Sequence, residues 1–390
     1  MHTDKSAAAR RLSALPLWAG VAVFVFVPVL LWVWIPKAQR RWGSWISPEV
    51  RTVGIARNEL GLRKVELIND EGDCDRISDV RSGDFDPQPG LEIVFADCKA
   101  AWTADTSGKI LKQVKFEKSL HAAVIVTMGG RGENLAFAES GNMWTLRTLD
   151  EQGHIRWQSG EDAQRRPNPP VLTQMVADVD GDGTPEFLVW TQGAGLRLMD
   201  AAQKTLWETD PDEHVISAVF LPDPSGRTAE VGYVTDKQEW VRRNWRGDLL
   251  QRVRPDVPAL NYPSVIAWPA GGSEPHLLQF FHDTITILDK QGSPVARLKA
   301  PLMKRLLMHA PLRATWVRFA ADRPYLVVPC QVYNEPRLVL HIYDEDGHLV
   351  YQETLKGSYA GVGVLDLGAG QPQALLLGGE GKVLKYALGR

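Results

Sequence analysis

Four acidic side chains at alternate positions could hold a metal ion. Asp178, Asp180, Asp182 and Glu186 take positions 1, 3, 5 and 9 of the segment DVDGDGTPE, and the backbone carbonyl of Thr184 is available at position 7. Calcium takes six to eight oxygen ligands, and a tight loop containing Gly can turn several carboxylates toward one ion. Without a cation, the clustered carboxylates would repel one another. The spacing predicts a calcium-type loop, and the alternative is a solvated acidic turn.

A second segment has the same spacing in weaker form. Asp84, Asp86, Gln88 and Glu92 take positions 1, 3, 5 and 9, with the carbonyl of Gly90 at position 7. Gln88 replaces an acidic residue, which lowers the expected affinity for calcium. In both segments we expect any bound metal to be structural, because no open coordination position beside a base is evident that would serve hydrolysis.

Two landmarks recur after about residue 60 and indicate short β-strands. One is a polar turn, usually with Gly, that precedes a strand, as in TSGKILKQ, EQGHIRWQ, WRGDLLQR and KQGSPVAR. The other is a loop that precedes an apolar strand, as in GDFDPQPGLEIVFAD and DVDGDGTPEFLVWT. Each landmark occurs seven times. Successive loops are roughly 45 to 50 residues apart, which is the length of a four-stranded propeller blade.

These repeats predict an all-β, seven-bladed β-propeller over residues 61–390. The first turn and strand, at 61–70, has no unit before it, and the last unit lacks a final strand. We therefore expect the amino-terminal strand to complete the carboxyl-terminal blade, which removes free sheet edges. An eight-bladed alternative would use residues 51–57 as a further strand.

The segment DVDGDGTPEFLVW resembles the FG-GAP or VCBS repeat family, whose propeller repeats are also found in integrin α-subunits. The resemblance extends in degenerate form over roughly residues 61–390. It implies that the calcium loops join the inner two strands of a blade. The other five loops have lost most of their oxygen ligands, so we expect no calcium there.

The amino-terminal region contains an apolar run long enough to span a bilayer. Residues 14–36 carry no charge over about 23 positions, which predicts a transmembrane helix, with tryptophans near both ends as interfacial anchors. Residues 1–13 would form a short cytoplasmic tail and 37–60 a juxtamembrane linker. Basic residues flank both sides of the run, so they do not orient it. A signal peptide is the weaker alternative, because no small-residue cleavage site follows.

Cysteine usage bears on the compartment. Cys74, Cys98 and Cys330 form no CxxC pair, which disfavours zinc and thioredoxin-like chemistry. Cys74 and Cys98 would lie near each other across neighbouring strands, either as a disulfide or as two buried thiols. The disulfide alternative, the calcium loop and the large carboxyl-terminal domain together favour an extracytoplasmic location, either periplasmic or extracellular.

The functional prediction is a non-enzymatic scaffold that binds a protein or glycan. A net charge of −3 with scattered Lys and Arg excludes a nucleic-acid footprint. The longest connections, at 160–170, 254–263 and 299–310, would carry recognition, and the family resemblance implies that they lie on the propeller face opposite the calcium loops. The alternatives are an extracytoplasmic polysaccharide lyase or hydrolase, and a quinone-type oxidoreductase. The tripeptide Arg246-Gly247-Asp248 occupies a predicted turn, and the nine His are scattered without a catalytic set.

Overall fold

The computed structural model describes residues 53–389 with short gaps. The gaps are residues 70–76, 86–89, 129–133, 140–146, 159–170, 181, 183, 185, 192–194, 201, 203, 223–228, 256–263, 269, 273, 282–283, 302–308, 312–313, 321, 333–335 and 369. The predicted tail, the predicted transmembrane helix at 14–36 and most of the predicted linker lie outside the described residues. Within those residues, no helix has the length and apolar character that crossing a membrane requires.

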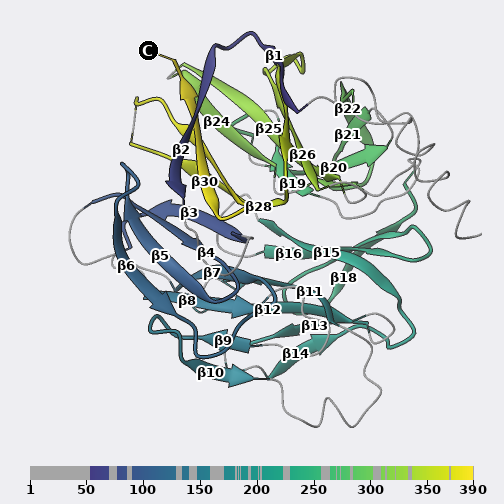
Figure 1. The fold of residues 1–390 in the computed structure, drawn as a ribbon. Coiled ribbons are helices and arrows are strands. Elements are labelled where there is room, and N and C mark those ends of the chain that lie inside the picture. The colour runs from purple at the N-terminus through teal and green to yellow at the C-terminus, as the bar shows by residue number, and fades with distance from the viewer. Residues whose placement is uncertain are drawn as a thin grey trace, which may run out of the picture.

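The described strands form seven antiparallel sheets arranged in a ring (Figure 1), which confirms the predicted seven-bladed propeller. Blade 1 contains β3 (Asp79–Gly83), β4 (Glu92–Ala96), β5 (Ala100–Asp105) and β6 (Ile110–Lys115). Blade 2 contains β7 (Ala123–Met128), β8 (Asn134–Glu139), β9 (Arg147–Leu149) and β10 (Ile155–Gln158). Blade 3 contains β11 (Val171–Ala177), β12 (Glu186–Thr191), β13 (Gly195–Met199) and β14 (Thr205–Glu208).

Blades 4 and 5 contain β15 (Val215–Pro222), β16 (Ala229–Thr235), β17 (Trp240–Arg243) and β18 (Leu249–Val253); and β19 (Ser264–Ala267), β20 (Pro275–Phe281), β21 (Thr284–Leu288) and β22 (Pro294–Lys299). Blade 6 contains β23 (His309–Pro311) and β24 (Thr315–Ala320), both paired with β25 (Arg323–Val332), then β26 (Arg337–Tyr343), β27 (Leu349–Lys356) and β1 (Gly54–Asn58). Blade 7 contains β28 (Tyr359–Leu365), β29 (Ala374–Gly379), β30 (Lys382–Leu388) and β2 (Leu62–Asn69).

The two ends of the described chain close the ring within blade 7. Strand β2 pairs antiparallel with β30, from Leu62 opposite Leu388 to Asn69 opposite Lys382. In Figure 1 the purple β2 accordingly lies beside the yellow β30. This confirms the prediction that the amino-terminal strand completes the carboxyl-terminal blade.

Strand β1 lies within the segment expected to be a linker, yet it belongs to blade 6. It pairs with the outer edge of β27, with Gly54 opposite Thr354 and Asn58 opposite Tyr351. The extra residues considered for an eighth blade therefore extend the sixth blade as a fifth strand, and the described sheets number seven. The linker prediction missed β1 because strand pairing across the molecule, rather than local composition, decides its conformation.

Outer strands are exposed in most blades, and the exception has a clear cause. Five of the six residues of β6 are exposed, and those of β14 and β18 are mostly exposed. In β27, six consecutive residues are buried. Strand β1 covers the edge of β27, and side chains of β27 such as Val350 and Leu355 pack in one apolar cluster with Tyr386 and other residues of blade 7.

Polar contacts, in addition to the apolar core, join neighbouring blades. The hydroxyl of Ser78 donates to the carbonyl of Ala123 (2.7 Å) and accepts from its N–H (3.0 Å), while the Asp79 carboxylate accepts from Ile125 N–H (3.0 Å). These bonds connect the inner edges of blades 1 and 2. Because Asp79 is buried, the bond to Ile125 satisfies an otherwise costly polar group.

Candidate functional site

The acidic loop of blade 3 connects its first two strands, β11 and β12. Asp178 directly follows β11 and Glu186 begins β12. Carboxylate oxygens of Asp178, Asp180 and Glu186 lie within 4.8 Å of one another, so three of the predicted ligands come together. Asp182 and Thr184 are not in this group. Backbone N–H groups in the loop donate to the neighbouring carboxylates, from Asp182 to Asp180 (3.1 Å) and from Thr184 to Asp182 (2.6 Å).

Glu186 is the buried member of the group. It is 3% exposed and accepts a hydrogen bond from Val179 N–H at 2.8 Å. The pKa of its carboxyl is raised to about 7: burial contributes most, the charges of Asp180, Asp182 and Asp178 act in the same direction, and the bond from Val179 opposes them. A divalent cation would offset both burial and repulsion. The donors are hard carboxylate oxygens, which is the set that calcium prefers, so these residues fit that ion.

The loop of blade 1 shares one structural feature with the loop of blade 3. It connects β3 to β4, and Phe85 N–H donates to the carboxylate of Glu92 at 2.8 Å. Glu92 is 5% exposed, whereas Asp84 and Gly90 are exposed. Asp86 and Gln88 lie outside the described residues. Position 2 thus donates to the acid at position 9 in both loops, although the remaining predicted ligands of this loop are not all placed.

Blade 7 shows a loop of related sequence in which protein groups neutralise the acid. The amide nitrogen of Gln373 donates to Asp366 at 2.7 Å, and the guanidinium of Arg318 lies 3.8 Å from the same carboxylate. Gln373 stands just before β29, one residue before Ala374, which takes the place that Glu186 has at the start of β12 in blade 3. An amide and a guanidinium therefore take the role here that a cation would take in blade 3.

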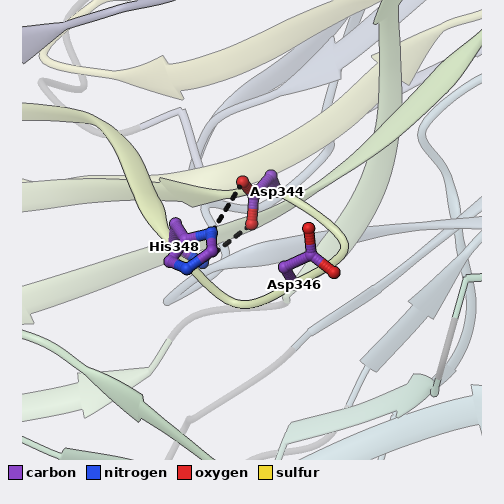
Figure 2. Close-up of side chains that lie close together, drawn as sticks. All are labelled: Asp344, Asp346 and His348. Atoms are coloured by element: carbon purple, nitrogen blue, oxygen red, sulfur yellow. Dashed lines mark hydrogen bonds and ion pairs between the residues drawn. The ribbon is translucent and has the colours of Figure 1, made fainter.

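A second group of possible ligands lies in the β26–β27 hairpin and contains Asp344, Asp346 and His348 (Figure 2). His348 N–H donates to Asp344 at 2.7 Å, and its ring Nδ1 lies 3.2 Å from the same carboxylate. The His348 side chain is 76% exposed. Figure 2 shows dashed contacts between Asp344 and His348 and none to Asp346.

The same hairpin construction occurs in six blades, which explains the group at Asp344 without a metal. In each hairpin, an Asp or Asn oxygen accepts the backbone N–H four residues later, as in Asp105 and Lys109, Asp150 and His154, Asp200 and Lys204, Asn244 and Asp248, Asp289 and Ser293, and Asp344 and His348. Short polar side chains commonly stabilise turns in this way. Arg246-Gly247-Asp248 forms part of one such turn, with Gly247 at a φ of 90°.

Two surface cavities were not predicted from the sequence. One, of about 300 Å³, is charged and lies beside the β14–β15 connection and the β16–β17 hairpin. In its wall, the Glu213 carboxylate accepts from the Tyr233 hydroxyl (3.0 Å) and pairs with Arg252, which also pairs with Glu239 (2.8 Å). The ion pairs of Arg252 therefore connect residues of this wall to one another.

The other cavity is a groove of about 370 Å³ with mixed apolar and polar lining between blades 1 and 2, which we call the β6 groove. Its lining residues are Phe85, Val94, Ala101, Thr103, Leu111, Lys112, Val114, Leu135, Phe137 and Glu151. Sequence reasoning missed it because its walls come from the packing of two separate sheets, blades 1 and 2. The one sequence signal was the pair of aliphatic residues in the outer strand KILKQVK.

The cysteines differ in state. Cys98 is disulfide-bonded, whereas Cys330 is a free thiol buried in β25. The remaining cysteine of the sequence, Cys74, lies outside the described residues. Burial raises the pKa of the Cys330 thiol well above its usual value, so this thiol is protonated and inert at neutral pH.

Comparison with known proteins shows the fold. No protein-family model and no curated protein matches the sequence, so the resemblance to FG-GAP or VCBS repeats stays a prediction. Two similar solved structures are crystals of BBS1N in complex with ARL6DN, one soaked with mercury and one with lead. The first has 11% identity and a TM-score of 0.56, and the second 10% and 0.55. Each match covers 86% of this chain and 98% of the other. At this identity the likeness shows a shared propeller fold.

Proposed function

We propose that this chain is a non-enzymatic propeller, anchored in a membrane by residues 14–36, that binds a protein or glycan partner outside the cytoplasm. The observation that carries the proposal is the closed ring of seven sheets. Closure through β2 and β30 makes a rigid frame, and loops and outer strands on such a frame are the usual places for recognition.

A protein partner is the better supported of the two classes. The similar propeller BBS1N was crystallised in complex with a second protein chain, ARL6DN. The β6 groove offers apolar surface of the kind that side chains of protein partners occupy. The connections at 160–170, 254–263 and 299–310 fall largely outside the described residues and stay predicted recognition loops.

The extracytoplasmic location rests on the disulfide of Cys98, because disulfides persist mainly in oxidising compartments. Calcium is the proposed stabilising cofactor. Its principal site would use Asp178, Asp180 and Glu186, whose carboxylates already converge. A weaker site in blade 1 would use Asp84 and Glu92. Bound ions would hold the β11–β12 and β3–β4 loops and raise stability by mass action.

The decisive experiment is purification of the full chain from detergent-solubilised membranes, followed by reconstitution with each copurifying protein. We expect a stoichiometric complex that reforms from the two purified components. Protease protection on intact cells tests the location in parallel, and only an external propeller would be digested. Turnover of a polysaccharide, or bound-cofactor absorbance in the visible range, would instead favour the enzymatic alternatives.

A further inference from the structure

The outer edge of blade 1 differs chemically from the outer edge of blade 6. Strand β6 is the last strand of its sheet, so one row of its backbone groups has no strand partner among the described residues. Ile110 is 43% exposed and Leu111 is 51% exposed. Exposed aliphatic residues at a sheet edge provide both hydrogen-bonding groups and apolar surface for another strand.

Blade 6 shows what such an edge looks like when a strand covers it. Leu349 and Val350 stand two and three residues after Gly347, as Ile110 and Leu111 do after Gly108. Strand β1 pairs along β27, and Val350, whose carbonyl accepts from Glu59 N–H just after β1, is only 8% exposed. The edges of the two blades are therefore equivalent in sequence position, and one of them already accepts a fifth strand.

The β6 groove lies against this edge and offers space for an apolar side chain. Leu111, Lys112 and Val114 of β6 line one side, and Leu135 and Phe137 of blade 2 line another. Its volume of about 370 Å³ is at the lower end of the range for ligand pockets. The groove opens beside the exposed strand, so an added strand could place one side chain inside it.

The charged residues of β6 indicate which kind of segment could bind at this edge. Lys109, Lys112 and Lys115 stand on or directly before β6, and the strand itself has no acidic residue. The acids nearby are Glu151 on the groove wall and Glu117 after the strand, whose carboxylate accepts from Ile155 N–H. Edge lysines discourage the pairing of two identical edges, because like charges would meet. The same lysines attract an acidic segment.

We propose that β6 and its groove bind an extended segment of a protein partner, in which acidic residues flank an apolar side chain. The segment adds as a fifth strand to blade 1, as β1 does to blade 6. Its apolar side chain enters the β6 groove beside Lys112, and its carboxylates, on the other face of the added strand, face Lys115. The inference rests on the proposed protein-binding function and specifies the surface and the chemistry of the partner.

The test uses the full chain in detergent and fluorescent peptides of about eight residues, a length that matches a strand. One peptide alternates Glu with Val around a central Phe, and its control replaces every Glu with Lys. We expect the acidic peptide to bind at least about tenfold more tightly, which is about 1.4 kcal/mol. Hydrogen exchange should show new protection at residues 110–115.

Matched variants separate this edge from a general affinity for peptides. Leu111→Glu and Lys112→Glu should each weaken binding of the acidic peptide, while Leu250→Glu on β18 should leave it unchanged. Leu250 is the control because it is 48% exposed and also lies three residues after a turn Gly. Both leucines are on the surface, so unfolding is not expected.

Three results would overturn the inference. They are equal binding of both peptides, protection outside β6, and self-association of the chain that Leu111→Glu abolishes, which would make a second copy the occupant. If a reconstituted native partner binds Leu111→Glu as tightly as the wild type, this surface is rejected as the binding site, while the proposed binding function remains supported. Failure of any protein to bind the full chain would reject the proposed protein-binding function itself.

Discussion

The backbone N–H of Val179 lies 2.8 Å from the carboxylate of Glu186, and it joins the second position of the blade 3 loop to the ninth. Phe85 and Glu92 make the same bond at the same length in blade 1. The bond holds a buried carboxylate at the base of each loop while leaving its other oxygen available. Two blades thus keep a Glu where blade 7 has Ala374, and in blade 7 the amide of the preceding Gln373 donates to Asp366.

Glu186→Gln should remove most of the stabilisation that calcium gives the chain. The amide keeps the size of the side chain but lacks the anionic oxygen that a hard cation needs. At a calcium concentration of about 100 times Kd, the wild type should gain about 2.7 kcal/mol in unfolding free energy, and the variant much less. Thermal melts with calcium and with chelator measure the difference.

The matched control for that variant is Asp346→Asn in the β26–β27 hairpin. Asp346 is exposed and belongs to the other group of possible ligands. We assign that group to turn stabilisation, so its loss should leave the calcium response unchanged. A calcium response that disappears with Asp346→Asn and persists with Glu186→Gln would reverse the assignment.

Stability in chelator should fall as pH rises toward neutrality. The pKa of Glu186 is raised from 4.5 to about 7 in the folded state. Between these values, the folded chain binds more protons than the unfolded chain, so the contribution is complete below pH 4.5 and is lost as pH rises through 7. Urea unfolding of the wild type and Glu186→Gln across this range isolates the effect, because the variant cannot titrate there.

Saturating calcium should reverse this trend, since the ion favours the charged carboxylate. A wild type that becomes more stable relative to Glu186→Gln between pH 5 and pH 7.5 in chelator would disprove the predicted direction. Equal slopes for the two proteins would show that Glu186 titrates near its ordinary pKa.

The repeat spacing predicted the blades because each sheet needs its own hairpins. Turn residues such as Gly247 identify these hairpins in the local sequence. The acids of the blade 3 loop were equally visible, since Asp178 and Glu186 are close in the chain. Strand β1 and the β6 groove were not predicted. Both depend on contacts between segments far apart in sequence, such as Phe85 and Phe137, which no local pattern contains.

Glu353→Leu should destabilise the junction of blades 6 and 7 by about 2–4 kcal/mol, because it leaves the polar groups that contact Glu353 without their partner. The Glu353 carboxylate, 1% exposed, accepts from the hydroxyls of Tyr351 and Tyr386, each at 2.8 Å, and pairs with Lys64. Tyr386 and Lys64 lie on the two strands that close the ring.

Glu353→Gln is the informative companion, because it retains one oxygen that can accept from both tyrosines and replaces the charged oxygen opposite Lys64 with an amide NH2. Its cost should therefore be smaller than that of Glu353→Leu. Denaturant unfolding gives both values. If leucine is tolerated as well as glutamine, apolar packing rather than the polar contacts holds this junction.

Gln238→Gly should stabilise the chain by about 1 kcal/mol. A non-glycine residue at positive φ costs about 1–2 kcal/mol, which glycine relieves, but glycine also loses more backbone entropy on folding and so cancels part of the gain. Gln238 has a φ of 60° in the β16–β17 hairpin. Its N–H donates to the Thr235 carbonyl at 3.0 Å, just as Gly247 N–H donates to the Asn244 carbonyl in the β17–β18 hairpin. Within the described residues, Gln238 Oε1 is buried without a hydrogen-bond partner.

Gly247→Ala is the reverse test in the neighbouring hairpin of the same blade. Its φ is 90°, and an added Cβ would lie 2.7 Å from Cγ of Trp207, so this variant should lose more than the strain alone. Denaturant midpoints of the two variants should therefore move in opposite directions from the wild type. A lower midpoint for Gln238→Gly would mean that its side chain makes a favourable contact outweighing its backbone strain.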